Sequence, residues 1–341
     1  MKSDLINGYT QIDKSIEKVY VTPGVKKNNP NNNYLYLFYK CFFSDDPTII
    51  IKLENLPSFK YHLLFIRKLK GEKSLIHHHW YQFTNIKSFI KLLYKTFWLV
   101  LYKMAGGRIV WTLHNKYPHE KKWLTLNKIL RFLFARLADK LHVHCYSAIQ
   151  IMSEVFNINK NKFFVVEHPT YPVKFLNKED SITTLKEKYS LTDSLSQDSL
   201  IFLMFGQIAD YKGILEVVQI FINLPNSYRL IIAGATKKNG EKYGQLVRSF
   251  SQKTTNVIFI NRLIPGDDVH LFFASADYVL FNYKDILTSG GVVLALGYKK
   301  SIIAPNKGCL KELKDPNVFK FYDSAELESI LLSASQNTNK S

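Results

Sequence analysis

The sequence predicts an α/β protein built from two doubly wound domains. Short runs of β-branched and aromatic residues alternate with helical stretches along the chain, a pattern typical of strand–helix units and parallel sheets. Five or six such strands fall in each half, and a stretch rich in proline and polar residues separates the halves. A chain of 341 residues is long enough for two domains that each bury a core.

The strands of the first half are expected at Lys18–Val21, Thr48–Leu53, Ser74–His78, Arg108–Leu113, Lys140–His144 and Phe163–Val166. Those of the second half are expected at Leu200–Phe205, Arg229–Ala233, Asn256–Ile260, Tyr278–Phe281, Ser301–Ala304 and Val318–Phe321. A short helix, Ser181–Lys188, is expected to open the second half. The predicted domains are residues 1–170 and 171–330, and the polar tail, 331–341, is expected to be frayed.

Three expected helices of the first half combine Lys and Arg with large apolar residues: Ser58–Lys70, Lys87–Met104 and Lys121–Lys140. Lys87, Lys91 and Lys95 recur every four residues and so share one helical face. Such a helix can pack on a core and expose a solvated basic face, or it can lie in a membrane surface. We expect these three lysines to dock the protein on a membrane.

Most of the net positive charge of the chain lies in its first half. The net charge is +18, and residues 1–170 hold 26 basic and 11 acidic residues, which is +15 of that total. Nucleic acid and anionic lipid are the two candidate partners for such a surface. The polar N-terminal stretch is no signal peptide, and no apolar run approaches the roughly 20 residues of a spanning helix. The expected location is therefore cytoplasmic, peripheral on the inner face of the cell membrane.

The segment from Gly206 to Gly213 is the first expected anion site. It follows a strand and opens a helix, where glycine lets a ligand approach the backbone and free N–H groups favour phosphate. Lys212 adds a point charge for the same anion. The plain alternative is a tight turn with a solvated lysine.

A second segment has the same character. Thr288, Ser289 and Gly290 follow a strand and precede an apolar helix, and Ser289 is a natural N-cap. Two phosphate-suited helix starts in one domain indicate a diphosphate, as in a nucleotide sugar. The expected donor-binding residues are Gly206, Gln207, Lys212, Gly213, Thr288, Ser289, Gly290 and Glu312.

The order and spacing of these segments resemble those of GT-B glycosyltransferases, especially the family 4-like enzymes of bacterial capsule, exopolysaccharide and O-antigen assembly. Five segments carry the resemblance: Gly206–Gly213, Leu230–Gly234, Phe273–Asp277, Ile76–Trp80 and Val110–Asn115. The resemblance covers nearly the whole chain. It implies two Rossmann-like domains that face a central cleft, the first for an acceptor and the second for a nucleotide-sugar donor. It also implies metal-independent transfer, so no metal and no other cofactor is expected.

The sequence departs from the family pattern at two places. Gln207 stands where the family has an arginine, so one cation for the diphosphate is missing. The paired glutamates of the family would fall at Ile286 and Leu294, and neither residue is acidic. The Thr288–Gly290 variant is closer to bacterial enzymes that extend polyprenyl-diphosphate sugars.

The candidate catalytic residues are histidines and a glutamate after strands of the first half. His114 suits proton transfer, because an unperturbed imidazole has a pKa near 6.5. Glu120 and His79 are expected beside it. His77, His78 and His79 alternate faces on a strand, so at least one of them is structural. A metal site is the alternative interpretation of these histidines.

The predicted function is transfer of a sugar from a nucleotide-diphosphate sugar to a saccharide acceptor, lipid-linked, in surface polysaccharide biosynthesis. Two alternatives stay open. A sugar-nucleotide epimerase can share the two-domain fold, and a basic nucleic-acid-binding protein would explain the charge. The sequence leaves open the sugar, the nucleotide, the linkage and the stereochemical course.

Overall fold

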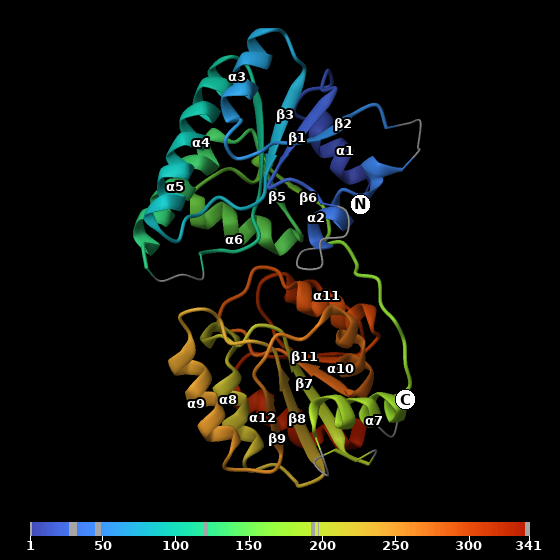
Figure 1. The fold of residues 1–341 in the computed structure, drawn as a ribbon. Coiled ribbons are helices and arrows are strands. Elements are labelled where there is room, and N and C mark those ends of the chain that lie inside the picture. Colours follow the sequence, from blue (N-terminus) through green and yellow to red (C-terminus); the bar gives the residue numbers. More distant parts are fainter. Residues whose placement is uncertain are drawn as a thin grey trace. The chain divides into compact units, whose positions relative to one another are not determined.

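The computed structural model describes residues 2–26, 33–44, 49–118, 122–191, 195–196 and 198–337. The chain divides into two compact units, Met1–Pro169 (unit 1) and Thr170–Ser341 (unit 2). Each unit is a parallel six-stranded sheet with helices on both faces (Figure 1). The predicted fold class is thereby confirmed.

The sheet of unit 1 has the strand order β2-β1-β3-β4-β5-β6. Its strands are β1 (Lys18–Thr22), β2 (Lys52–Asn55), β3 (Ser74–His78), β4 (Arg108–Thr112), β5 (Lys140–Val143) and β6 (Phe163–Val165). The order of the strands reverses between β1 and β3. Such a switch point is where the carboxyl ends of parallel strands leave room for a ligand.

Helices cover both faces of this sheet. They are α1 (Lys2–Thr10), α2 (Asn33–Phe38), α3 (Tyr61–Leu69), α4 (Ile86–Met104), α5 (Leu124–Leu137) and α6 (Tyr146–Phe156), with short 3-10 turns η1 (Lys40–Phe43) and η2 (Lys160–Lys162). Buried residues of α1 and α2 form one core with β1, β3 and β4, while α3, α4 and α5 lie along the opposite face (Figure 1). A capping box fixes the start of α4, where Asn85 and Ser88 bond each other's backbone N–H groups.

The sheet of unit 2 has the order β12-β11-β10-β7-β8-β9, so its switch point lies between β7 and β10. The strands are β7 (Leu200–Phe205), β8 (Tyr228–Ala233), β9 (Val257–Ile260), β10 (Tyr278–Leu280), β11 (Ser301–Pro305) and β12 (Val318–Phe321). The helices are α7 (Lys178–Tyr189), α8 (Ile214–Phe221), α9 (Glu241–Ser251), α10 (Val269–Ser275), α11 (Gly290–Gly297) and α12 (Ser324–Asn337), with 3-10 turns η3 (Asp210–Lys212), η4 (Gly266–Asp268) and η5 (Gly308–Glu312). One core lies under α7, α10 and α11, and a second lies under α8 and α12.

The predicted strands all occur, with one clear shift. The second strand was expected from Thr48, but β2 begins at Lys52 because its pairing with β1 starts there, Lys18 opposite Lys52. The helix expected at Ser181–Lys188 is longer at both ends. Asn177 caps its start, and Ser190 ends it in the left-handed region (φ 53°).

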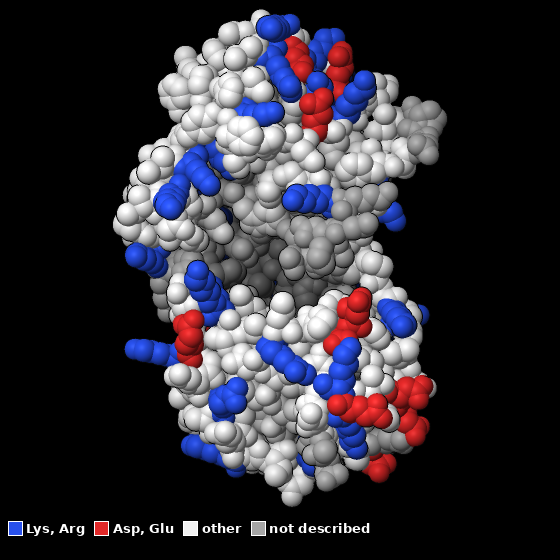
Figure 2. Space-filling model, in the orientation of Figure 1, with Lys and Arg blue, Asp and Glu red and all other residues white. Residues whose placement is uncertain are grey.

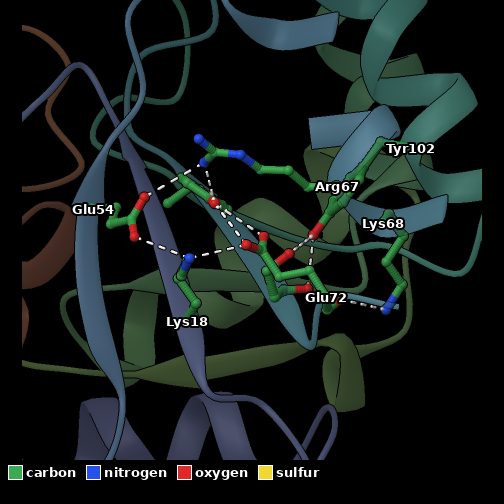
Figure 3. Close-up of polar contacts among 8 residues, drawn as sticks. Lys18, Glu54, Arg67, Lys68, Glu72 and Tyr102 are labelled. Atoms are coloured by element: carbon green, nitrogen blue, oxygen red, sulfur yellow. Dashed lines mark hydrogen bonds and ion pairs between the residues drawn. The ribbon is translucent and has the colours of Figure 1, made fainter. Parts of the chain in front are cut away.

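An ion-pair network fixes the β1–β2 edge of unit 1 (Figure 3). The Lys18 ammonium lies 2.9 Å from a carboxylate oxygen of Glu72 and 3.0 Å from one of Glu54. The Arg67 guanidinium, from α3, lies 3.5 Å from the other oxygen of Glu54. Lys18 begins β1, Glu72 precedes β3, and Glu54 on the edge strand pairs with the middle of β1, so we assign these residues a structural role.

Candidate functional site

The loop after β7 in unit 2 is held where two strand ends come close together. Gly206 has a φ of +94°, and a Cβ atom on Gly234 would lie 2.1 Å from the Gly206 carbonyl oxygen. Both positions therefore need glycine. A Cβ on Gly206 would also lie 3.1 Å from the Lys212 ammonium, so this glycine leaves space for the lysine side chain.

Lys212 turns back toward the strand that precedes it. Its ammonium donates to the Phe205 carbonyl oxygen at 3.1 Å, and it lines a small hollow with Gly206, Asn282 and Tyr283. Burial lowers the pKa of this ammonium to about 8. Among the described residues it has no acidic partner, so the site holds a desolvated cation at the switch point.

Gly213 joins the two loops of the switch point. Its φ is +61°, and the Asn282 amide donates to the Gly213 carbonyl oxygen at 2.9 Å. A Cβ at this position would lie 2.3 Å from the Asn282 carbonyl oxygen, so the approach of the two backbones requires glycine. Lys284 extends the same junction, with its ammonium 2.7 Å from Asp210 and 2.8 Å from Glu216. These contacts fix the position of Lys212 relative to the segment after β10.

The N-terminus of α11 lies on that segment. Ser289 is the N-cap, as predicted: its Oγ accepts the Val292 N–H at 3.3 Å and lies 2.8 Å from the Tyr283 hydroxyl. The Val293 N–H bonds to the Ser289 carbonyl oxygen. Within the part of the chain that the structure describes, the N–H groups of Gly290 and Gly291 have no acceptor. This is usual for the first residues of a helix.

The amides of the Gly206–Gly213 loop are less available than the sequence suggests. The Gly206 N–H bonds to the last carbonyl of β8 and the Ile208 N–H to a carbonyl just after β8, whereas those of Lys212 and Gly213 bond within the loop. At the start of α8, the Leu215 N–H is taken by the Tyr243 hydroxyl. The positive charge that this loop can offer a ligand therefore comes mainly from the Lys212 side chain.

The other predicted donor residues lie in the same unit. Gln207 is exposed directly after Gly206, and Thr288 is half-buried before the N-cap of α11. Glu312 is half-buried at the end of η5, after β11. Sequence reasoning missed Asn282 and Tyr283, which bond to Gly213 and Ser289. Their place directly after β10, next to β7 in the sheet, is the signal that could have found them.

In unit 1, polar rings gather at the carboxyl ends of β3, β4 and β5. His79 is buried, with 1% of its surface exposed, and its Nδ1 lies 3.3 Å from Nε2 of His114. Its Nε2 lies 2.8 Å from the Tyr39 hydroxyl. His114 itself is half-buried and stacks on Trp80, with the ring centroids 4.9 Å apart. Of these two rings, His114 is therefore the one that a substrate can reach, whereas His79 is buried.

The same cluster extends across the sheet. The His77 ring bonds to the Tyr9 and Tyr39 hydroxyls and to Thr112, whose hydroxyl also contacts His142. Tyr34, from α2, packs edge-on against His114 with the ring centroids 5.0 Å apart. Sequence reasoning did not assign α2 to this site, because nothing in its short apolar run indicates that it covers histidines.

Burial sets the protonation of these rings. It lowers the pKa of His77, His79 and His114 well below the ordinary value, and the neighbouring histidines lower it further. His114 is thus a neutral imidazole at neutral pH, the form that can accept a proton. His78 points to the opposite face, where it packs on Tyr81 and Phe134 and where neither ring nitrogen finds a hydrogen-bond partner among the described residues.

One expectation for this site has no structural description, and the metal interpretation can be checked on the described residues. Glu120 lies outside the described residues, so its position relative to His114 stays a prediction. Within the described ranges, no group of three histidine, cysteine or carboxylate side chains has a geometry that could hold a metal ion.

The three basic helices of unit 1 correspond to α3, α4 and α5. Lys87 and Lys91 are exposed on α4, but the half-buried Lys95 ammonium lies over the Tyr61 ring, 5.2 Å from its centroid. Burial lowers the pKa of Lys95 as well, so this lysine does not share the solvated face of the other two. None of the described helices is long and apolar enough to cross a membrane.

A stripe of large apolar side chains runs along the solvent face of α4. We call it the α4 stripe; its members are Ile86, Ile90, Leu93, Phe97, Val100 and Met104. Their exposed fractions lie between 38% and 77%, and their spacing of three or four residues places them on one face. Over α4 and α5, Figure 2 shows white and blue atoms, whereas the visible acidic side chains of unit 1 gather at the top of the view.

Comparison with known proteins identifies the fold. No protein-family model and no curated protein matches the sequence. Among solved structures, the chain is similar to HepE from Anabaena, in complex with UDP and glucose, with 14% identity and a TM-score of 0.68 over 95% of this chain and 91% of that one. The fold is GT-B.

Two further structures have the same architecture. A glycosyltransferase from Rickettsia africae has 12% identity and a TM-score of 0.63, covering 95% of this chain and 89% of that one. Sucrose-phosphate synthase from Thermosynechococcus elongatus has 12% identity and a TM-score of 0.61, covering 94% and 90%. The GT-B units of this chain thus place Lys212 and the start of α11 at the switch point of the second sheet, and His114 at the strand ends of the first.

Proposed function

We propose that the protein is a glycosyltransferase that takes a sugar from a nucleotide-diphosphate sugar. The observation that carries this proposal is the desolvated Lys212 ammonium at the switch point of unit 2, in a hollow also lined by Tyr283, whose hydroxyl contacts the N-cap of α11. A cation and a helix start together favour an anion such as a diphosphate. The GT-B fold and the complexes of HepE with UDP and with UDP-glucose support the same ligand class.

The reaction breaks the bond between the anomeric carbon and the diphosphate oxygen, and forms a bond from that carbon to an acceptor hydroxyl oxygen. The diphosphate leaves with the electron pair, and Lys212 with the amides of Gly290 and its neighbour stabilise its growing charge. The acceptor hydroxyl loses its proton to His114, which burial keeps neutral. His79 acts as a positioning residue, because it is buried and contacts His114.

We propose that this transfer needs no metal ion. The leaving diphosphate would meet fixed positive charge from Lys212 and from the helix dipole of α11, which can take the part that a divalent cation plays elsewhere. Gln207, which replaces an arginine of the family pattern, leaves Lys212 as the main side-chain cation. Transfer activity that survives a chelator and does not rise with Mg²⁺ or Mn²⁺ is the expected result.

The acceptor in this proposal is a lipid-linked saccharide, and the wider role is assembly of a surface polysaccharide. The α4 stripe with Lys87 and Lys91 beside it supports peripheral binding to an anionic membrane. The net charge of the first 170 residues supports it as well. A protein held at a membrane surface would meet a lipid-linked acceptor there.

Calorimetric titration with UDP and GDP tests the donor site. Lys212→Ala should weaken binding about 10- to 150-fold, since a hydrogen bond to a charged group contributes about 1.5–3 kcal/mol. Lys238→Ala, an exposed lysine of the same unit, is the matched control and should bind as the wild type does. Unchanged affinity in a folded Lys212→Ala protein would place the donor elsewhere and reject the proposal.

A further inference from the structure

A groove of about 450 Å³ opens on unit 1 between α5 and α6. Apolar side chains form most of its walls: Ile129, Phe132 and Leu133 from α5, and Val155 and Phe156 from α6. This volume lies in the range of about 300–1,000 Å³ that is usual for small-molecule sites. The described lining of the groove includes none of the histidines discussed above, and the groove plays no part in the steps described above.

The apolar wall from α5 is uncovered in the protein alone. Ile129 and Leu133 are 52% and 55% exposed, and Phe132 is 38% exposed. Contiguous exposed apolar surface inside a concave site favours an apolar ligand, because burial gains about 25 cal/mol per Å². An alkyl or prenyl chain suits an apolar wall of this composition.

Arg131 adds a buried cation to the same groove. Only 6% of the residue is exposed, and burial lowers the pKa of its guanidinium to about 10. It donates to the Asn115 carbonyl oxygen at 2.7 Å and lies over the Trp111 ring, 5.0 Å from the centroid. It has no carboxylate partner among the described residues, although a buried charge is normally paired.

Two lysines rim the groove beside Arg131. The ammonium groups of Lys128 and Lys116 lie 4.4 Å and 5.5 Å from the centroid of the Tyr117 ring. The described lining contains no aspartate or glutamate. The groove therefore has three cations beside its apolar walls and no acidic side chain in the described lining. Such a site suits a ligand with a negatively charged end and an apolar chain.

We propose that this groove binds one lipid molecule with a single apolar chain that ends in a phosphate. The phosphate would bond to Arg131 and the two lysines, and the chain would cover Ile129, Phe132 and Leu133. That this lipid is an acceptor of the enzyme rests on the proposed function, in which the acceptor is lipid-linked. That the groove binds an apolar chain with a phosphate is argued from the residues that line it.

Dodecyl phosphate, titrated below its micelle concentration into the full-length protein, tests the site by calorimetry. One molecule should bind to each protein. Inorganic phosphate, which lacks the chain, and dodecyltrimethylammonium, which reverses the charge, should each bind at least about tenfold more weakly. Equal binding of inorganic phosphate would mean a plain anion site, and equal binding of the cationic amphiphile would mean an unspecific apolar surface. Either result overturns the proposal.

Variants locate the binding in the groove. Lys128→Glu and Leu133→Asp should each weaken dodecyl phosphate binding about tenfold or more. Both residues lie on the outer part of α5, so the fold should persist, and melting curves check this. Leu246→Asp on α9, a similarly exposed leucine at 42%, is the matched control and should bind normally. Normal binding by both groove variants would overturn the proposal.

UDP titration of the same proteins keeps the two proposals separate. A wild type that binds UDP but no dodecyl phosphate would reject the groove site and leave the donor site standing. A wild type that binds dodecyl phosphate but neither UDP nor GDP would reject the donor site and leave the groove. Folded groove variants should keep the UDP affinity of the wild type.

Discussion

At the scale of single residues, His114 differs from its neighbours in being accessible. The buried His79 ring contacts the His114 ring and Trp80 stacks on it, so the His114 ring is held in place while the residue stays partly exposed. The motif in the sequence predicted the residue. It could not predict the depressed pKa, because that depends on rings from other strands and on α2, which are distant in the sequence.

His114→Ala should lower the turnover number about 10²- to 10⁴-fold, the usual contribution of a general base. The affinity for UDP should stay the same, because the residues that we propose for the donor lie in unit 2. Initial rates with a nucleotide sugar and a lipid-linked acceptor, beside a UDP titration, provide the measurement. Near-normal turnover in the variant would show that another group takes the proton. His79→Gln should have a smaller effect, and its pH–rate profile should shift.

Lys212 predicts how donor affinity depends on pH. The pKa of its ammonium is lowered to about 8, so the group is charged at pH 7 and loses its charge as the pH rises through 8. UDP affinity should therefore fall between pH 7 and pH 9. Lys212→Arg stays charged over this range and should bind with little change. Because the ionisation of UDP is common to both proteins, the ratio of their affinities isolates Lys212. A constant ratio would contradict this assignment.

Residues that make contacts within one motif were predictable, and residues that join motifs were not. Ser289 could be identified as a helix cap from its own neighbourhood. Asn282 could not be assigned to Gly213, because their contact depends on β7 and β10 being neighbours in the sheet. The sequence also suggested free amides along the Gly206–Gly213 loop, but four of them are occupied: two bond to carbonyls at the end of β8 and just after it, and two bond within the loop.

At the scale of helices and strands, the alternation of patterns was sufficient to predict the strands, but it placed only the helices α3, α4, α5, α7, α8 and α11. The tail from residue 331, expected to be frayed, instead continues α12 to Asn337, because Leu331 and Ala334 are buried in the core. The edge strand β2 deviated most, since only its pairing with β1 fixes where it begins. The periodicity of α4 correctly placed Lys87 and Lys91 on an exposed face. It did not reveal that Lys95 folds onto Tyr61, nor that the α4 stripe stays uncovered.

The α4 stripe predicts binding to anionic vesicles. Each Lys or Arg near such a surface contributes about 1 kcal/mol, and inserted apolar side chains add to this. Lys87→Glu with Lys91→Glu should weaken retention in a vesicle sedimentation assay, and 1 M salt should release most of the wild type, because screening then acts within about 3 Å. Phe97→Asp should weaken retention even at low salt.

Matched controls separate charge from apolar insertion. Lys95→Gln should have less effect than either exposed lysine, because its ammonium lies over Tyr61. Leu246→Asp, on α9 of unit 2, should leave retention unchanged. Equal retention on neutral and anionic vesicles would contradict the electrostatic part of the mechanism, and full retention of Phe97→Asp would contradict insertion of the stripe.

At the scale of the whole molecule, the two units differ in charge and in histidine content although their folds are alike. Most of the excess positive charge (+15 of +18) and nine of the ten histidines fall in the first 169 residues, and so do all four tryptophans. The two-sheet fold follows from local patterns that both halves share. The different use of the two sheets depends on a few side chains at the strand ends, which patterns do not reveal.

Buried histidines make the stability of unit 1 sensitive to acid. His77, His78, His79, His142 and His144 are each at most 6% exposed, and burial lowers the pKa of all five below the ordinary 6.5 of an unfolded chain, to about 4 for His142. Below pH 6.5 the unfolded state therefore binds more protons than the folded state. Stability is full above pH 6.5 and falls as the pH drops toward the folded pKa values.

The size of this effect predicts that unit 1 unfolds first in acid. At pH 5.5, one unit below 6.5, each of the five rings costs at most about 1.4 kcal/mol, or about 7 kcal/mol together. That is comparable with the 5–15 kcal/mol by which a typical domain is stable.

Tryptophan fluorescence reports on unit 1 alone, so it should change between pH 6 and pH 4.5. Hydrogen exchange read by mass spectrometry should show faster exchange in peptides from residues 1–169, while those from 170–341 stay protected. His78→Phe should move the midpoint to lower pH, because this ring makes no hydrogen bond with any described residue. Simultaneous loss of protection in both units, or an unchanged fluorescence signal at pH 4.5, would show that the histidines do not control acid unfolding.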